Sequence, residues 1–101
     1  MNLPDDPILL ELLPEFIDDW MIEIENFNIY ESNGQTVELY RMGHTLKGSC
    51  YQFGLRDLGD IGLEMMNCSK NSDWKEARHL YYKIKQRLIE IDDYMIHNNL
   101  V

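Results

Sequence analysis

Apolar side chains recur every three to four residues along most of the chain, which is the period of an amphipathic α-helix. The first such segment runs from Asp6 to about Tyr30. Asp6 suits the cap before a helix and Pro7 its first position. Pro14 removes one backbone hydrogen bond, so we expect a kink there or a short separate helix before it. The apolar stripe comprises Leu9, Leu12, Leu13, Phe16, Ile17, Trp20, Met21, Ile24 and Phe27.

A second helix is predicted between Ser32 and Phe53. Ser32 and Gln35 are spaced as in a capping box, in which two side chains satisfy each other's free backbone donors. Gly54 suits the left-handed residue that follows a helix end. The residues expected along the inward face are Val37, Tyr40, Gly43, Leu46, Cys50 and Phe53.

Two more helices complete the pattern. The third runs from Leu55 to a polar stretch at residues 69–72, and the fourth follows a second capping box formed by Asp73 and Glu76. Their inward residues are Leu55, Leu58, Ile61, Gly62 and Met65, then Ala77, Leu80, Tyr81, Ile84, Leu88, Ile91 and Met95. No segment alternates with a period of two. We therefore predict an all-α chain, a single domain over residues 1–101 folded as an antiparallel up-down four-helix bundle.

The register of the second and third helices follows from the turn at Gly54. In a simple hairpin centred there, facing residues have numbers that sum to about 109–110. This places His44 opposite Met65–Met66. It also keeps Cys50 far from Cys68, so both thiols are expected to be small apolar fillers rather than a disulfide.

The net charge of −9 is unevenly distributed. Residues 1–40 contain ten acidic and no Lys or Arg residues, whereas residues 41–101 contain eight acidic and nine basic ones. Such a chain repels polyanions, which argues against nucleic-acid binding and against anionic membrane surfaces. The acidic half is interpreted first as a solvated helix face, with a docking role as the alternative. The opening residues lack a basic signal-peptide start and no apolar run of about 18 residues occurs, so we expect a cytoplasmic protein.

Of the three histidines, His44 is the chemical candidate. His79 and His97 lie outside the apolar stripe of the fourth helix and are expected at the surface. His44 lies in the middle of the second helix, with Lys47 and Gly48 three and four residues later on the same face. A neutral imidazole is a competent nucleophile toward phosphorus. Lys47 could balance the added charge, and Gly48 would leave room for a partner.

Other interpretations of this face are weaker. Taken singly, His44, Lys47 and Gly48 are ordinary surface or packing residues. A metal site lacks a second ligand one turn from His44, and no serine or cysteine is placed beside a histidine as a hydrolase requires. The chain also lacks the glycine-rich nucleotide loop of a kinase.

The stretch RMGHTLKGSCYQFGLRDLGDIGLEMM, residues 41–66, resembles the signature of histidine-containing phosphotransfer (HPt) domains. The matching positions are His44, Thr45, Leu46, Lys47, Gly48, Ser49, Cys50, Gly54 and Leu58. The resemblance implies a phosphoryl acceptor at His44, a charge-stabilising Lys47 and steric clearance at Gly48. The expected partner is a receiver domain of a response regulator or hybrid kinase, which would contribute an aspartyl phosphate and its own magnesium ion.

The same resemblance implies a monomeric phosphocarrier that needs no cofactor of its own. The residues expected to contact the partner are Tyr40, Arg41, Thr45, Tyr51 and Gln52. The sequence departs from the family at Met66, where many members place a glutamine or glutamate that hydrogen-bonds the histidine; Glu64 lies two residues earlier. A methionine packs but does not orient the ring as an amide does. The alternative function is a helical adaptor that binds receiver or kinase domains without being phosphorylated.

Overall fold

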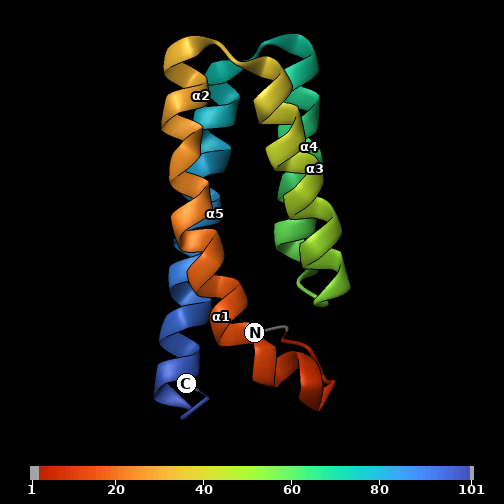
Figure 1. The fold of residues 1–101 in the computed structure, drawn as a ribbon, viewed down its shortest axis with the longest axis vertical. Coiled ribbons are helices and arrows are strands. Elements are labelled where there is room, and N and C mark those ends of the chain that lie inside the picture. Colours follow the sequence, from red (N-terminus) through yellow and green to blue (C-terminus); the bar gives the residue numbers. More distant parts are fainter. Residues whose placement is uncertain (1–2, 101) are drawn as a thin grey trace.

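The computed structural model describes residues 3–100, and every regular element in that span is a helix. The chain rises through a first arm, descends, rises again and returns, so neighbouring arms are antiparallel (Figure 1). The bundle measures 40 × 19 × 17 Å. The predicted up-down four-helix bundle is confirmed. Its elements are α1 (Pro7–Glu23), the 3₁₀ turn η1 (Ile24–Asn26), α2 (Phe27–Asn33), α3 (Thr36–Gln52), α4 (Arg56–Asn71) and α5 (Trp74–His97).

The first arm comprises α1, η1 and α2. Asp6 caps α1 as predicted, because its carboxylate accepts a hydrogen bond from the backbone N–H of Ile8 at 2.8 Å. Pro14 lies inside α1 without ending it, although the first turns of the helix bend away from the rest (Figure 1). A separate short helix before Pro14 is therefore wrong. The α-helix of the first arm is interrupted later, at η1.

The predicted capping box at Ser32 is also wrong. Ser32 lies within α2, which continues to Asn33 and ends at Gly34 in the left-handed region, with φ at +60°. The Gln35 N–H then bonds the carbonyl oxygen of Tyr30 at 2.9 Å. Gly34 closes the preceding helix in this way, and Gln35 precedes α3 without a side-chain cap.

The other two helix boundaries agree more closely with the sequence. Gly54, with φ at +75°, follows the end of α3. The Asp73 carboxylate accepts from the Glu76 N–H at 3.1 Å and caps α5. The Asp73 N–H bonds the carbonyl of Cys68 at 2.9 Å, so the reciprocal half of the second capping box is not formed.

The core matches the predicted stripe in α5, where all seven expected residues are buried, and differs from it in α3. Leu39 and Met42 are buried in place of Val37 and Tyr40, which are 62% and 36% exposed. Two stripes of helical period are available in α3, and they share Gly43, Leu46 and Cys50. The chosen stripe buries two purely apolar side chains, whereas burying Tyr40 would require a partner for its hydroxyl group.

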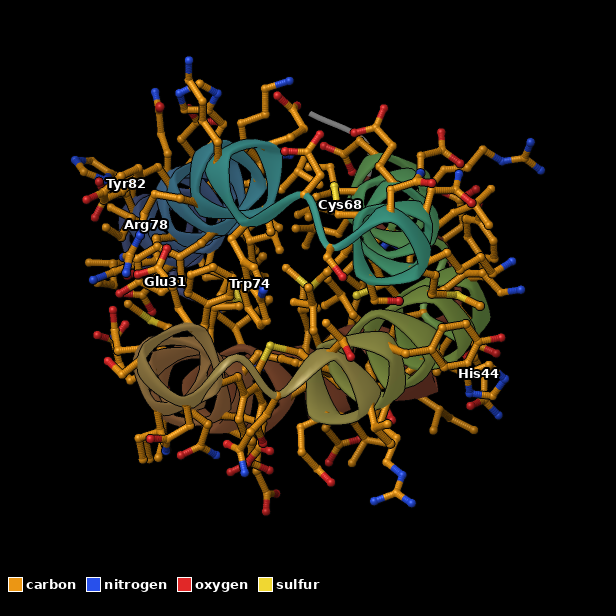
Figure 2. The ribbon with its side chains drawn as sticks, turned by 90° about the horizontal axis from the view of Figure 1, so that it is seen from above. Glu31, His44, Cys68, Trp74, Arg78 and Tyr82 are labelled. Carbon is orange, nitrogen blue, oxygen red and sulfur yellow. The ribbon has the colours of Figure 1, made fainter. Side chains whose placement is uncertain are left out.

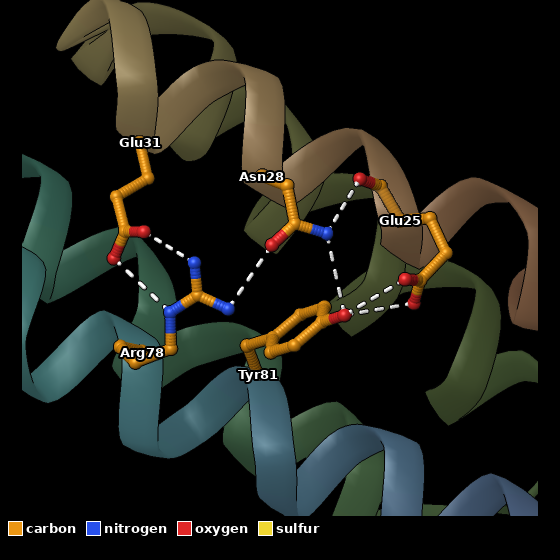
Figure 3. A network of polar contacts seen from close by, with 5 residues as sticks. All are labelled: Glu25, Asn28, Glu31, Arg78 and Tyr81. Carbon is orange, nitrogen blue, oxygen red and sulfur yellow. Dashed lines mark hydrogen bonds and ion pairs between the residues drawn. The ribbon is translucent and has the colours of Figure 1, made fainter.

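A polar network joins the first arm to α5 (Figure 3). The Arg78 guanidinium donates to both carboxylate oxygens of Glu31 and to the Asn28 side chain, the last at 3.0 Å. The Tyr81 hydroxyl donates to the Glu25 carboxylate at 2.9 Å. These bonds hold the pKa of Glu31 and that of Glu25 below their ordinary value. The network therefore fixes α2 against α5 with charge-assisted hydrogen bonds.

Candidate functional site

Glycine residues lie at the contact between α3 and α4. A Cβ atom on Gly62 would lie 2.7 Å from both the Gly43 carbonyl oxygen and the Lys47 backbone nitrogen. A Cβ atom on Gly43 would lie 3.0 Å from the Met66 backbone nitrogen. The two backbones therefore touch with no room for a side chain, and the pairing follows the register predicted from the turn. This contact fixes the stretch of α3 that carries His44.

His44 follows Gly43 directly and is turned outward from the bundle (Figure 2). Successive residues of an α-helix project about 100° apart, so a glycine facing α4 places the next side chain toward solvent. The rings of His79 and His97 approach a carboxylate at 3.4 Å and a carbonyl at 2.8 Å. Within residues 3–100, the His44 ring makes no hydrogen bond. Its nitrogens are therefore open to an incoming group.

Lys47 lies one turn beyond His44 and is half-buried. Its backbone packs against Gly62, whereas its ammonium forms no ion pair with any residue that the structure describes. Arg41, one turn before His44, instead donates to the Glu38 carboxylate at 2.8 Å. Lys47 thus provides, on the helix face of His44, a positive charge that no described residue pairs with.

Gly48 differs from the glycines of the helix contact. A Cβ atom at Gly48 would meet nothing within 4 Å, whereas one at Gly59 would lie 2.2 Å from the Tyr51 ring. Packing inside the described chain therefore gives no reason for a glycine at position 48. Its effect is to leave bare backbone next to His44.

The predicted partner residues near His44 form one surface. The Tyr40 ring lies parallel to the His44 ring, with centroids 6.4 Å apart and an interplanar angle of 19°. A surface pocket of about 340 Å³ is lined by Tyr40, Arg41, His44 and Thr45. Tyr40, Arg41 and Thr45 therefore lie around the His44 imidazole.

Tyr51 and Gln52 lie two turns beyond His44, at the end of α3. Gln52 is exposed. The Tyr51 ring covers Gly59 and its hydroxyl donates to Asp60 at 2.5 Å, which raises the pKa of Tyr51. Tyr51 therefore leans onto α4 rather than toward the imidazole.

Two features of the site were missed by sequence reasoning. Lys70 of α4 holds its ammonium 5.9 Å from the centre of the Tyr40 ring, a cation–π contact. The pairing register would have placed these two residues opposite each other. A second surface pocket, of about 470 Å³, joins Thr45 to Asp19, Trp20, Ile22 and Glu23 of α1. No local pattern indicates which face of α1 lies beside α3.

Neither cysteine offers a nucleophile at this surface. Cys50 and Cys68 are free and buried, and burial raises the pKa of Cys50 to about 12. Among residues 3–100, no group of three His, Cys, Asp or Glu side chains is arranged to hold a metal ion. In the same span, no helix has the length and apolar character needed to cross a membrane.

The family model of the Hpt domain matches residues 11–94. The chain belongs to the Hpt domain family. Hpt domains carry phosphoryl groups between receiver domains in phosphorelays and are not kinases. The match includes the whole His44 face. No curated protein and no solved structure matches the chain.

Proposed function

We propose that His44 accepts a phosphoryl group from the aspartyl phosphate of a receiver domain, in a response regulator or hybrid kinase, and passes it to a second receiver. The observation that carries this proposal is the composition of one exposed helix face. Among residues 3–100, it combines an imidazole without hydrogen bonds, an ammonium without an ion pair and bare backbone, at His44, Lys47 and Gly48. A non-phosphorylated adaptor has no need of this combination.

The chemistry follows from these groups. A ring nitrogen of His44 attacks the phosphorus atom with its lone pair. The N–P bond forms as the P–O bond to the partner's aspartate breaks, and the carboxylate leaves with the electron pair. The added negative charge lies in the middle of α3, away from the stabilising N-terminal end of the helix dipole. The Lys47 ammonium, one turn away, supplies the compensating charge.

The partner completes the site. Its acidic pocket is expected to bring the magnesium ion that neutralises the phosphoryl oxygens, so this chain needs no metal of its own. The bare backbone at Gly48 gives its phosphate-bearing loop close access to His44. Tyr40, Arg41 and Thr45 would contact the partner around the imidazole, with Tyr51 and Gln52 toward the end of α3.

The docking surface is proposed to extend onto α1 through Thr45, which lines both the histidine pocket and the α1 pocket. Ile22 is 75% exposed there, between the acidic residues Asp19 and Glu23. An apolar side chain flanked by carboxylates fits a receiver surface that presents an apolar residue between basic ones. Such charges act mainly on the association rate and on the choice of partner.

The test is phosphoryl transfer from a panel of purified receiver domains, phosphorylated with labelled phosphate. We expect an acid-labile, base-stable label on the wild-type chain and none on His44→Gln. His79→Gln and His97→Gln are the matched controls, because both remove an exposed histidine of α5 and should keep the label. A label that persists in His44→Gln would refute the assignment. Receiver binding without any labelling of the wild type would instead establish the adaptor.

A further inference from the structure

The His44 ring is exposed, and an exposed histidine on a helix exchanges between several rotamers. A nucleophile reacts faster when it is held in the attacking geometry. No hydrogen bond from any described residue holds this ring. On α4, the neighbour of this stretch is Met66, whose side chain offers only a thioether. Any restraint on the ring must therefore come from packing.

Tyr40 supplies such a restraint. It lies one helical turn before His44, so the two side chains share a face. Their rings are nearly parallel, and the centroid separation of 6.4 Å falls within the range of offset aromatic pairs. The Lys70 ammonium, 5.9 Å from the Tyr40 ring centre, contacts the same tyrosine from α4. The tyrosine is thereby held from a second helix while it packs against the imidazole.

From this geometry we infer that Tyr40 is the positioning residue of the His44 imidazole, and that it limits the ring to orientations in which a nitrogen is presented to the phosphoryl donor. This inference rests on the proposed function of His44. Tyr40 acts through the aromatic plane rather than through its hydroxyl group, since no hydrogen bond joins the two side chains. An aromatic pair of this kind corresponds to about a two- to tenfold effect on the reactive population.

The experiment separates positioning from docking by using phosphoramidate, a small phosphoryl donor that needs no protein surface. We expect Tyr40→Leu to slow labelling of His44 by phosphoramidate by about two- to tenfold, because the stack is lost. Tyr40→Phe keeps the ring and should restore the wild-type rate. Tyr94→Leu is the matched control, since Tyr94 is a similarly exposed tyrosine on α5. Circular dichroism checks that each variant folds.

A spectroscopic measurement reports the stack directly. The His44 ring protons should shift in the NMR spectrum of Tyr40→Leu, as the ring current of the tyrosine is lost, and should stay near their wild-type positions in Tyr40→Phe. If Tyr40→Leu reacts with phosphoramidate at the wild-type rate, the positioning role is overturned, even where transfer from a receiver falls. If wild-type His44 takes no label from any donor, the proposed function fails, and this inference fails with it.

Discussion

Gly48 is predicted to lower the stability of the bundle while serving phosphoryl transfer. A glycine inside a helix is less favourable than alanine by about 0.5–1 kcal/mol, and a Cβ atom here would meet nothing within 4 Å. Gly48→Ala should therefore stabilise the protein by about that amount. For a domain of this size the midpoint of thermal unfolding should rise by about 2–8 °C.

Gly62→Ala is the matched comparison, because it makes the same chemical change on the neighbouring helix. Its Cβ atom would lie 2.7 Å from two backbone atoms of α3, which cannot move without separating the helices. Overpacking of this kind costs about 1–3 kcal/mol, more than the gain in helix propensity. Thermal or urea unfolding followed by circular dichroism should thus show opposite shifts for the two substitutions.

The functional half of this prediction uses a larger side chain. Gly48→Gln should fold normally and still take phosphate from phosphoramidate at His44. Its transfer from a phosphorylated receiver should fall by up to about a hundredfold, because the side chain displaces the partner's loop from the imidazole. Normal receiver transfer in Gly48→Gln, or a less stable Gly48→Ala, would refute the clearance argument.

Further substitutions test the charges and the network. Lys47→Ala should slow transfer about ten- to a hundredfold, as expected for a lost charge-assisted hydrogen bond, with Lys47→Arg retaining most of the rate in the same assay. Met66→Gln should keep the phosphoryl label and add a hydrogen bond to the imidazole, visible as a changed tautomer balance by NMR. Arg78→Met should lower the free energy of unfolding in urea by about 1–3 kcal/mol. Glu25 and Glu31 have lowered pKa values in the folded state. Their contribution to the free energy of unfolding is therefore present above the ordinary value of 4.5 and is lost as the pH falls below it. Acid unfolding of Glu31→Gln should accordingly show a weaker pH dependence than that of the wild type.

Local patterns predicted most of the fold. The stripe of α5 is correct because its seven residues recur every three to four positions, whereas Tyr82, Ile89 and Ile96 recur only every seven and are exposed. The error in α3 has a physical cause, since Val37 and Tyr40 continue one helical stripe while Leu39 and Met42 continue another. Burial decides between the two stripes, and burial depends on the neighbouring helices.

The boundary before α3 was misassigned for a related reason. Ser32 and Gln35 have the spacing of a cap, but Gly34 between them adopts the left-handed conformation that closes α2. A glycine that ends one helix competes with a serine that could begin the next. The sequence shows both signals, and the tertiary position of α2 against α5, held by Arg78, decides in favour of the glycine.

The part of the site that lies within α3 could be predicted from sequence, since residues three and four apart necessarily share a helix face. That rule places Lys47 and Gly48 beside His44, and it applies equally to Tyr40. The contact between Tyr40 and Lys70 requires the register of two helices, and the pocket at Ile22 requires the approach of a third. A contact is therefore harder to predict from the linear sequence when it depends on the placement of more helices.

Glycine shows most clearly how the structure separates packing from function. Gly43, Gly62 and Gly48 all lie inside helices, and the helical period already places the first two on inward faces and the third on the face of His44. The first two bring α3 and α4 into backbone contact and so fix the segment beneath His44, whereas a Cβ atom on the third would meet no described residue within 4 Å. A site whose backbone is held on one side of a helix and whose reactive groups lie on the other is preorganised. Substitutions on the exposed side are therefore expected to alter receiver binding while the backbone contact beneath His44 stays intact.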